Sequence, residues 1–298
     1  MADPEISVII PTYNRKAMLE KTLTAFSRQT AMPELFEVIV VDDGSSDRTE
    51  DAVNRLISNS AYSLRFIKQA NKGPAAARNR ALKEARGRVI LFTGDDILPG
   101  EDMVERHIAG HRKIKNIAIL GFVDWYKDIE ITDFMRHIAP NGLQFRYNGI
   151  KDADDCGFRF FYTANISLDK KWFEDALFDE EFRFAALEDI ELGYRLETKG
   201  LRIVFDKSTV GYHCHEITFD YFCKRMKRVG VSADILTRKH PELRKTLVPL
   251  PIGLLTVIHN VIKPLRPLNR IDNRFLWDLY LAASYIDGLL ARSDRSVL

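Results

Sequence analysis

Four apolar, β-branched runs alternate with helix-like stretches between Ile6 and Gly94. The runs are ISVIIP, FEVIVVDDGS, LRFIKQ and RVILFTG, and each leads into a polar turn. Strands that alternate with helices at this spacing are typical of βαβ units, in which the strands lie parallel and helices cover both faces of the sheet. The sequence therefore predicts an α/β fold with a Rossmann-like, mostly parallel central sheet flanked by helices.

The helices of this region carry recognisable start and stop signals. Apolar residues recur at helical intervals from Lys16 to Phe26. A second helix is expected to start at Ser46 or Asp47, with Glu50 completing a capping box, and to run to about Ile57. A third helix is expected to open after Gly73-Pro74 and to close at Gly87.

Polar side chains cluster where the predicted strands end. PTYNR follows the first strand, DDGS ends the second and GDD follows the fourth. Each stretch alone is an ordinary turn, because Asp and Asn side chains bond nearby backbone groups. In an open parallel sheet, however, ligands bind outside the carboxyl ends of the strands, so we expect the three stretches to converge on one crevice.

Asp95 and Asp96 come directly after a strand that is apolar enough to be buried. Two like charges at one point are costly unless a positive charge lies between them. Mg²⁺ or Mn²⁺ bound to a diphosphate would supply that charge through oxygen ligands. His213 and His215 are predicted to share one face of a strand. Because no third close ligand accompanies them, they suit a place in the same divalent site better than a zinc site.

A second group of acids opens the predicted helix ALEDIELGYRLETKG. Acids are common in a first helical turn because the helix dipole favours them, so a capping role is one interpretation. The functional interpretation makes Glu188 or Asp189 a general base that takes a proton from a hydroxyl.

The rest of the chain is less regular. Residues 124–157 read as a long, partly ordered loop. Regular structure is expected to return with FRFFYTANISLDKKWFEDA, and strands are expected in LRIVFD and STVGYHCHE. The basic segment after Phe222 can be helical up to His240-Pro241. Residues 247–262 are apolar but interrupted by prolines, which suits either a core helix or a segment resting on an anionic membrane. The last apolar stretch, FLWDLYLAASYIDGLLAR, could dock on the core or mediate a homodimer.

The composition indicates where the protein is located and which partners it binds. No basic and apolar leader opens the chain, and three cysteines are too few for a disulfide framework, so a cytoplasmic protein is expected, with the inner face of the membrane as an option. The net charge is +2, but residues 224–274 hold twelve Lys and Arg against three Asp and Glu. Such a concentration of positive charge in one segment favours contact with phosphate or an anionic surface. Few aromatic residues lie among these cations, which argues against nucleic acid as a partner.

Five motifs in this order resemble family 2 glycosyltransferases of the GT-A fold. They are VIIPTYNR, VIVVDDGSSDRT, NKGPAAARNRAL, ILFTGDDILP and EDIELGYRLETKGLRI followed by YHCHE, and together they span Ile6 to Thr218. The resemblance implies a GT-A nucleotide-sugar transferase domain over residues 1–218. Residues 219–298 would form a helical extension that makes acceptor, membrane-surface or dimer contacts.

The resemblance also implies roles for individual residues. Pro11 and Tyr13 would line the nucleoside pocket, Asp43 would accept a hydrogen bond from a base, expected to be uracil, and Asn71 would lie along the nucleotide. The full set of predicted nucleotide-binding residues is Pro11, Thr12, Tyr13, Asn14, Arg15, Asp43, Lys72, Gly73, Arg78 and Asp95. The predicted metal ligands, for Mn²⁺ or Mg²⁺, are Asp96, Asp95, His213 and His215. The predicted catalytic residues are Asp189, as the base, and Glu188 beside it.

One position departs from the family pattern. The metal motif of the family is Asp-x-Asp, and Gly94 stands where its first Asp is expected. The implied reaction is an inverting sugar transfer from a nucleotide-sugar, with UDP expected, to a hydroxyl of a glycan or lipid-linked acceptor. Two alternatives stay open: a non-catalytic relative that only binds the nucleotide-sugar, and a nucleotidyltransferase, although PTYNRKAM lacks the Gly-rich basic loop expected of the latter.

Overall fold

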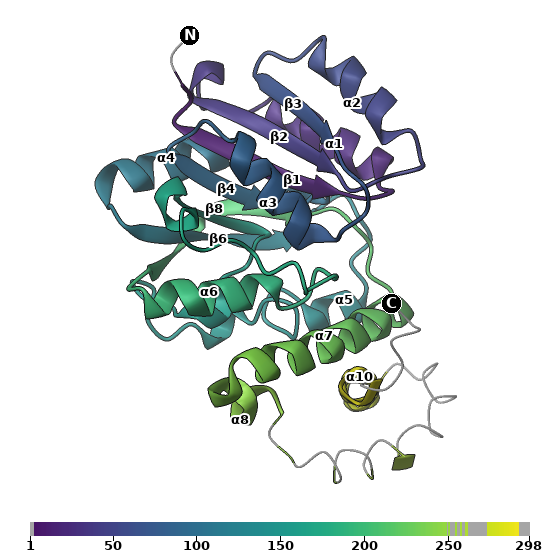
Figure 1. Cartoon of the computed structure of the whole chain (residues 1–298). Helices are drawn as coiled ribbons and strands as arrows, with labels where there is room; N and C mark the ends of the chain where they lie inside the picture. The colour runs from purple at the N-terminus through teal and green to yellow at the C-terminus, as the bar shows by residue number, and fades with distance from the viewer. Residues whose placement is uncertain are drawn as a thin grey trace.

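The computed structural model describes residues 3–248 and 273–291, together with residues 250, 254, 257, 260 and 261. Its eight-stranded sheet has the order β3-β2-β1-β4-β7-β6-β8-β5 (Figure 1). In that order the strands are Ser63–Lys68, Phe36–Asp42, Ile6–Thr12, Val89–Thr93, Asn165–Asp169, Ile117–Trp125, Arg202–His213 and Ile97–Pro99.

The sheet is mixed, with parallel pairing in the majority. β1 pairs in parallel with β2 and β4, β2 with β3, and β6 with β8. The pairs β4–β7, β6–β7 and β5–β8 are antiparallel. The predicted α/β fold with a mostly parallel sheet is therefore confirmed. Antiparallel β7 sits in the middle of the sheet, where residues 124–164 bring the chain back in the opposite direction.

Helices cover both faces of the sheet because side chains alternate along each strand. Ile6, Val8 and Ile10 pack on one face against α1 (Lys16–Phe26), α2 (Thr49–Ile57) and α4 (Met103–Lys113). Ile9 belongs to a second cluster on the opposite face. That cluster takes in residues of α3 (Pro74–Glu84), α5 (Asp133–Ile138) and α6 (Glu188–Thr198).

The predicted capping box of α2 is wrong. The residue before the helix is Arg48, which has a left-handed backbone with φ of 64° and makes no side-chain cap bond. Asp47 instead accepts hydrogen bonds from the backbone N–H groups of Lys16 and Thr49. Glu50 forms an ion pair with Lys68 of β3, in which Glu50 Oε2 lies 2.8 Å from Lys68 Nζ. A partner on the neighbouring strand thus replaces the local bond that the motif predicts.

The segment predicted as a loop is largely packed into the core. It contains the end of β6, which extends to Trp125, and the helix α5. Phe134 of α5 makes edge-to-face ring contacts with Phe219, Phe222 and Trp277. These partners lie far along the chain, so a local hydrophobic pattern could not reveal the order of this segment.

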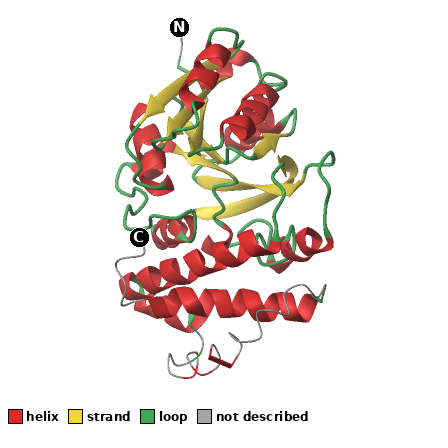
Figure 2. Ribbon diagram, turned by 90° about the vertical axis from the view of Figure 1, so that its right-hand side faces the viewer, coloured by secondary structure: helices red, strands yellow, loops and turns green. Residues whose placement is uncertain are grey.

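Helices at the C-terminal end complete the described fold. α7 (Phe219–Lys239), which confirms the predicted helix, lies beside α10 (Arg274–Leu290), and a short α8 (Arg244–Leu247) follows α7 (Figure 2). α7 and α10 cross at two glycines: a Cβ on Gly230 would lie 2.9 Å from the Cα of Gly288. Leu281 joins the main core, so α10 docks within the chain. The homodimer stays a prediction, and residues 247–262 lie mostly outside the described residues.

Two histidines of α4 are fully buried beneath the sheet in a hydrogen-bonded network. His107 contacts Asn165 Oδ1 through Nε2 at 2.9 Å and Ser167 Oγ through Nδ1 at 2.7 Å. His111 Nε2 lies 2.8 Å from the same Ser167 hydroxyl. Burial lowers the pKa of each imidazole from 6.5 to about 4. Both rings are therefore neutral in the folded protein at neutral pH.

This network predicts a loss of stability in mild acid. Between pH 6.5 and 4 the unfolded chain binds two protons that the folded protein excludes, so the free energy of unfolding falls as the pH falls. The expected loss is about 3 kcal/mol for each histidine. Urea unfolding of His111→Gln, which keeps a donor for Ser167, should show a shallower pH dependence than the wild type. Equal dependence in the two proteins would contradict the prediction.

Candidate active site

The acid pair after β4 is held by residues from the end of β1. Thr12 donates its hydroxyl to Asp95 Oδ2 at 2.8 Å. Arg15 Nη1 donates to Asp95 Oδ1 at 3.0 Å and to Asp96 Oδ2 at 2.6 Å. The pairing of β1 with β4 places the two strand ends side by side, as expected for neighbouring parallel strands. The predicted crevice therefore contains a positive charge between its two acids, and that charge belongs to a side chain.

The two carboxyl groups have opposite pKa shifts. Burial, and then the Asp96 charge, raise the pKa of Asp95 to about 6, against the opposing pull of Arg15 and Thr12. Burial also acts to raise the pKa of Asp96, but the nearby His213 and Arg15 outweigh it and hold this pKa at about 2. Asp95 is therefore the carboxyl of the pair that takes up a proton more readily.

His213 lies closer to the acids than His215 does. β8 ends at His213, which pairs with Ile97 of β5. Because Ile97 follows Asp96 in the chain, this pairing brings His213 Nε2 to 3.6 Å from Asp96 Oδ2. His215 lies two residues beyond the end of β8, so the strand position predicted for it is wrong. Its ring centre nevertheless lies 6.1 Å from that of His213 and 5.4 Å from that of Tyr221. Among the residues that the structure describes, no group of three or more His, Cys, Asp or Glu side chains is arranged to hold a metal ion.

Within the part of the chain that the structure describes, Asp96 and His213 fit a divalent cation, and His215, whose buried Nε2 also has no hydrogen-bond partner, lies beside His213. Asp96 Oδ2 and His213 Nε2 are close enough for one ion to contact both, and the buried His213 Nδ1 has no hydrogen-bond partner. Mg²⁺ and Mn²⁺ accept such donors and take phosphate oxygens and water for the rest of their shell. These donors fit a cation that is bound together with a diphosphate.

Gly94 shapes the acid pair through its missing side chain. A Cβ at this position would lie 2.7 Å from Asp96 Oδ1. An Asp at position 94 would therefore displace the carboxylate of Asp96 from its present position. The departure from Asp-x-Asp is thus built into the local geometry, and Asp96 uses the space that it frees.

Asp43 organises the loop that follows β3. Its Oδ1 accepts hydrogen bonds from Gln69 Nε2 at 2.8 Å and Lys72 N at 2.9 Å, and its Oδ2 accepts one from Gly73 N at 2.8 Å. Asp43 is 4% exposed, whereas Lys72 and Asn71 beside it are exposed. The sequence therefore placed Asp43 and residues 71–73 correctly in one neighbourhood. Gln69 is a member that motif reading missed.

The PTYNR stretch splits into inward and outward side chains. Thr12 and Arg15 turn toward the acids, whereas Tyr13 is 49% exposed at the sheet edge. Pro11 is half-buried at the end of β1, opposite Val41. Asn14 holds the neighbouring loop, because its Oδ1 accepts a hydrogen bond from Ser46 N at 2.8 Å. The stretch thus joins the acid pair to the loop that contains Asp43.

The two acids of α6 have different surroundings. Asp189 is half-buried, and its Oδ2 accepts a hydrogen bond from Thr163 N at 3.2 Å. Glu188 is 2% exposed and forms an ion pair with Arg78 Nη1 at 2.8 Å. Burial and the neighbouring Asp189 raise the pKa of Glu188, although Arg78 opposes them. Arg78 is itself buried, with its guanidinium 5.3 Å from the centre of the Phe178 ring.

Asp189 belongs to the same sheet edge as the acid pair. Thr163 comes two residues before Asn165, and Asn165 pairs with Thr93 at the end of β4. Asp95 follows Thr93 by the same two residues. The hydrogen bond between Thr163 and Asp189 therefore ties the start of α6 to the strand end that carries Asp95 and Asp96.

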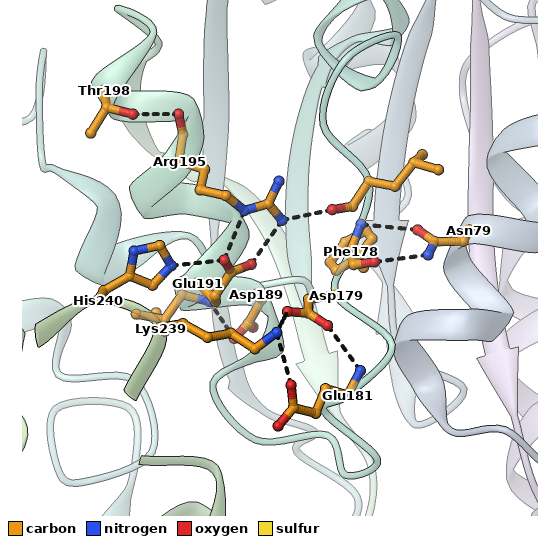
Figure 3. Close-up of polar contacts among 12 residues, drawn as sticks. Asn79, Phe178, Asp179, Glu181, Asp189, Glu191, Arg195, Thr198, Lys239 and His240 are labelled. Carbon is orange, nitrogen blue, oxygen red and sulfur yellow. Dashed lines mark hydrogen bonds and ion pairs between the residues drawn. The ribbon is translucent and has the colours of Figure 1, made fainter. Parts of the chain in front are cut away.

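Polar contacts hold α6 and the loop before it against the end of α7 (Figure 3). Glu191 is buried between Arg195, whose Nε lies 2.8 Å from it, and His240, whose Nε2 lies 3.0 Å from it. Lys239 reaches back to Asp179 and Glu181 in the loop before α6. The end of α7 thus anchors the helix that carries Asp189. Sequence reading missed His240 and Lys239 because their partners lie about fifty to sixty positions away.

Known proteins are similar to this chain over most of its length. A family model described as glycosyl transferase family 2 matches residues 7–176. Validoxylamine A glucosyltransferase of Streptomyces hygroscopicus subsp. limoneus is 28% identical over 274 residues, which cover 80% of this chain and 58% of that protein. The uncharacterized glycosyltransferase YfnE of Bacillus subtilis is 30% identical over 289 residues, covering 82% and 72%. The chain thus spans less than two thirds of the Streptomyces protein.

Solved structures share the fold. The mannosyltransferase PcManGT of Pyrobaculum calidifontis, in complex with GDP-Man and Mn²⁺, aligns with a TM-score of 0.65 and 18% identity over 98% of this chain and 89% of its own. TarS 1-349 of S. aureus, in complex with UDP-GlcNAc, aligns with a TM-score of 0.59 and 17% identity over 97% and 91%. The expected GT-A fold is confirmed by these neighbours.

Proposed function

Because this chain belongs to glycosyl transferase family 2, we propose that it transfers a sugar from a nucleotide-sugar to an acceptor hydroxyl with inversion at the anomeric carbon. The observation that carries the proposal is the meeting of two acidic groups at one sheet edge. The acid pair suits the donor, with Asp96 toward the diphosphate and its cation and Asp95 toward the ribose, and Asp189 suits the acceptor. An inverting transfer needs both groups and no covalent sugar–enzyme intermediate.

The donor nucleotide would lie across the ends of β1 and β2. Tyr13 is exposed there and offers a ring for a base, and Pro11 lies at the end of β1 opposite Val41. Asp43 holds the 69–73 loop and keeps accepting capacity for a base N–H, while the exposed Lys72 offers its ammonium group to phosphate. We favour UDP as the nucleotide, with support from the structural neighbour in complex with UDP-GlcNAc. Asp95, next to Thr12, would face the ribose.

Asp96 and His213 would hold Mn²⁺ or Mg²⁺, and the cation would supply positive charge for the diphosphate leaving group. The chain's own residues do the remaining work. Asp189 accepts the proton of the acceptor hydroxyl. The hydroxyl oxygen meanwhile attacks the anomeric carbon from the side opposite the diphosphate. Thr163 orients Asp189 through its backbone N–H. Glu188 and Arg78, paired beneath, fix the first turn of α6 and act as positioning residues.

The first test is calorimetric titration with UDP, with and without Mn²⁺. We expect binding that depends on the metal and weakens about tenfold or more in Asp96→Asn, because one of the protein donors loses its charge. Asp51→Asn, at an exposed ion pair with Arg48 on α2, is the matched control and should bind as the wild type does. Binding of equal strength in EDTA would remove the cation from the proposal. Absence of binding by UDP, GDP and dTDP would overturn the donor site.

We further propose that residues 1–218 carry the donor and catalytic groups and that residues 219–298 serve the acceptor side at an anionic membrane surface. No helix in the described part of the chain is long and apolar enough to cross a membrane. Leu254, Val257 and Val261 are nevertheless 47%, 59% and 63% exposed, at a spacing that fits one helical face. Lys and Arg flank them in the sequence. A lipid-linked acceptor would suit this arrangement.

Vesicle binding tests the membrane contact. We expect the protein to sediment with phosphatidylglycerol vesicles and not with phosphatidylcholine vesicles, and to be released by high salt, because charge attraction is screened. Val257→Asp should reduce binding several-fold, whereas Ile114→Asp, at an exposed apolar residue after α4, should not. Equal binding to both vesicles, or to neither, would contradict the proposal.

A further inference from the structure

The acid pair after β4 already has a cationic partner within the chain. One nitrogen of Arg15, Nη1, donates to both Asp95 and Asp96, at 3.0 and 2.6 Å. The other terminal nitrogen, Nη2, donates to the hydroxyl of Tyr221 in the first turn of α7 at 3.4 Å. The Arg15 side chain is 28% exposed and the two acids 8% and 15%, so the pair is largely removed from water while Arg15 keeps a path to solvent.

Arg15 and a cation held between Asp96 Oδ2 and His213 would share one carboxylate oxygen. Both oxygens of Asp95 accept protein hydrogen bonds, from Arg15 and Thr12. Asp96 Oδ2 accepts from Arg15 and is also the oxygen nearest His213 Nε2, at 3.6 Å. Asp96 Oδ1 is the oxygen that faces Gly94. A cation that contacts Asp96 and His213 would therefore meet the guanidinium at Oδ2, where two positive charges repel.

We propose that Arg15 closes the cation position in the absence of donor and must leave it when metal binds. This inference rests on the proposed function and goes beyond it, because it sets the order of binding. Free metal must compete with an internal ion pair. A metal–diphosphate complex brings its own negative charge, which gives the displaced guanidinium a new partner. Metal therefore enters with the nucleotide and binds weakly alone. Tyr221 makes α7 part of this closure.

Binding of Mn²⁺ alone, followed by electron paramagnetic resonance of the free ion, tests the proposal without any turnover. We expect Arg15→Gln to bind Mn²⁺ about tenfold more tightly than the wild type, the scale on which a neighbouring charge changes the proton affinity of a carboxylate. Arg55→Gln, which removes an exposed arginine paired with Glu20, is the matched control and should bind as the wild type does. Adding UDP should tighten Mn²⁺ binding in the wild type more than in Arg15→Gln.

Equal or weaker Mn²⁺ binding by Arg15→Gln would overturn the proposal, since Arg15 would then not compete with metal. Arg15→Lys provides a second variant if the first fails to fold. Its single amine cannot reproduce the bonds of the guanidinium to both acids and Tyr221, so we expect a smaller gain in Mn²⁺ affinity, and no gain would count against the proposal. UDP titration of the same proteins separates the two claims. If the wild type does not bind UDP at all, the proposed donor site is wrong. This result is independent of the effect of Arg15 on Mn²⁺ affinity.

Discussion

Replacement of Asp189 by Asn should lower kcat about 10²- to 10⁴-fold, the range typical of losing a general base, with little change in UDP affinity. In the wild type, Thr163 N donates to Asp189 Oδ2 at 3.2 Å, and the amide oxygen of Asn can accept the same hydrogen bond. The amide cannot, however, take a proton from the acceptor hydroxyl. The measurement is the rate at which UDP is released from a UDP-sugar, with an acceptor found by screening or with water as a slow acceptor. Calorimetry with UDP then separates catalysis from binding.

Asp133→Asn is the matched control for this experiment. Asp133 is also a first-turn acid, but it is exposed on α5 and paired with Arg136. We expect this variant to turn over as the wild type does. If Asp189→Asn retained kcat within a few-fold of the wild type, Asp189 would not be the base. If the wild type bound UDP but released none from any donor, the non-catalytic alternative would be favoured.

Replacement of Arg78 by Met should lower the free energy of unfolding by about 3–5 kcal/mol, because it leaves the buried Glu188 without its partner. Burial and Asp189 already raise the pKa of Glu188, and without Arg78 that pKa rises further. A carboxyl whose folded pKa lies above its unfolded value destabilises the protein increasingly as the pH rises. The loss should therefore be larger at pH 8 than at pH 5.5 in urea unfolding.

Two further variants isolate the ion pair. Arg80→Met, on the same helix but exposed and paired with Glu84, should cost less than about 0.5 kcal/mol. The double variant Arg78→Met with Glu188→Met should recover most of the lost stability, because an apolar pair of similar volume removes the unpaired charge. A small loss in Arg78→Met, equal to that of Arg80→Met, would show that the pair does not hold α6.

The general architecture and the neighbourhood of the site could be predicted because both depend on local patterns. Apolar runs that alternate with helices predict parallel strands, and the carboxyl ends of parallel strands share one edge. PTYNR, DDGS and GDD therefore had to approach one another. The middle of the chain could not be assigned in this way: Phe134 and Tyr147 are ordered by aromatic partners that include residues some sixty positions or more away.

Residue pairs within the site depend on contacts that no spacing rule contains. The reach of Arg15 across 80 residues to Asp95, the pairing of Arg78 with Glu188 and the approach of His213 to Asp96 follow from how β1, β4, β8 and α6 pack. Gly94 shows the difference clearly. Its identity suggests a weaker metal site, but only the structure shows that an added Cβ would lie 2.7 Å from Asp96 Oδ1 and would make this carboxylate move. Local chemistry determined which groups gather at this edge. Packing determined their partners, because a buried charge takes whichever opposite charge the tertiary structure brings within reach.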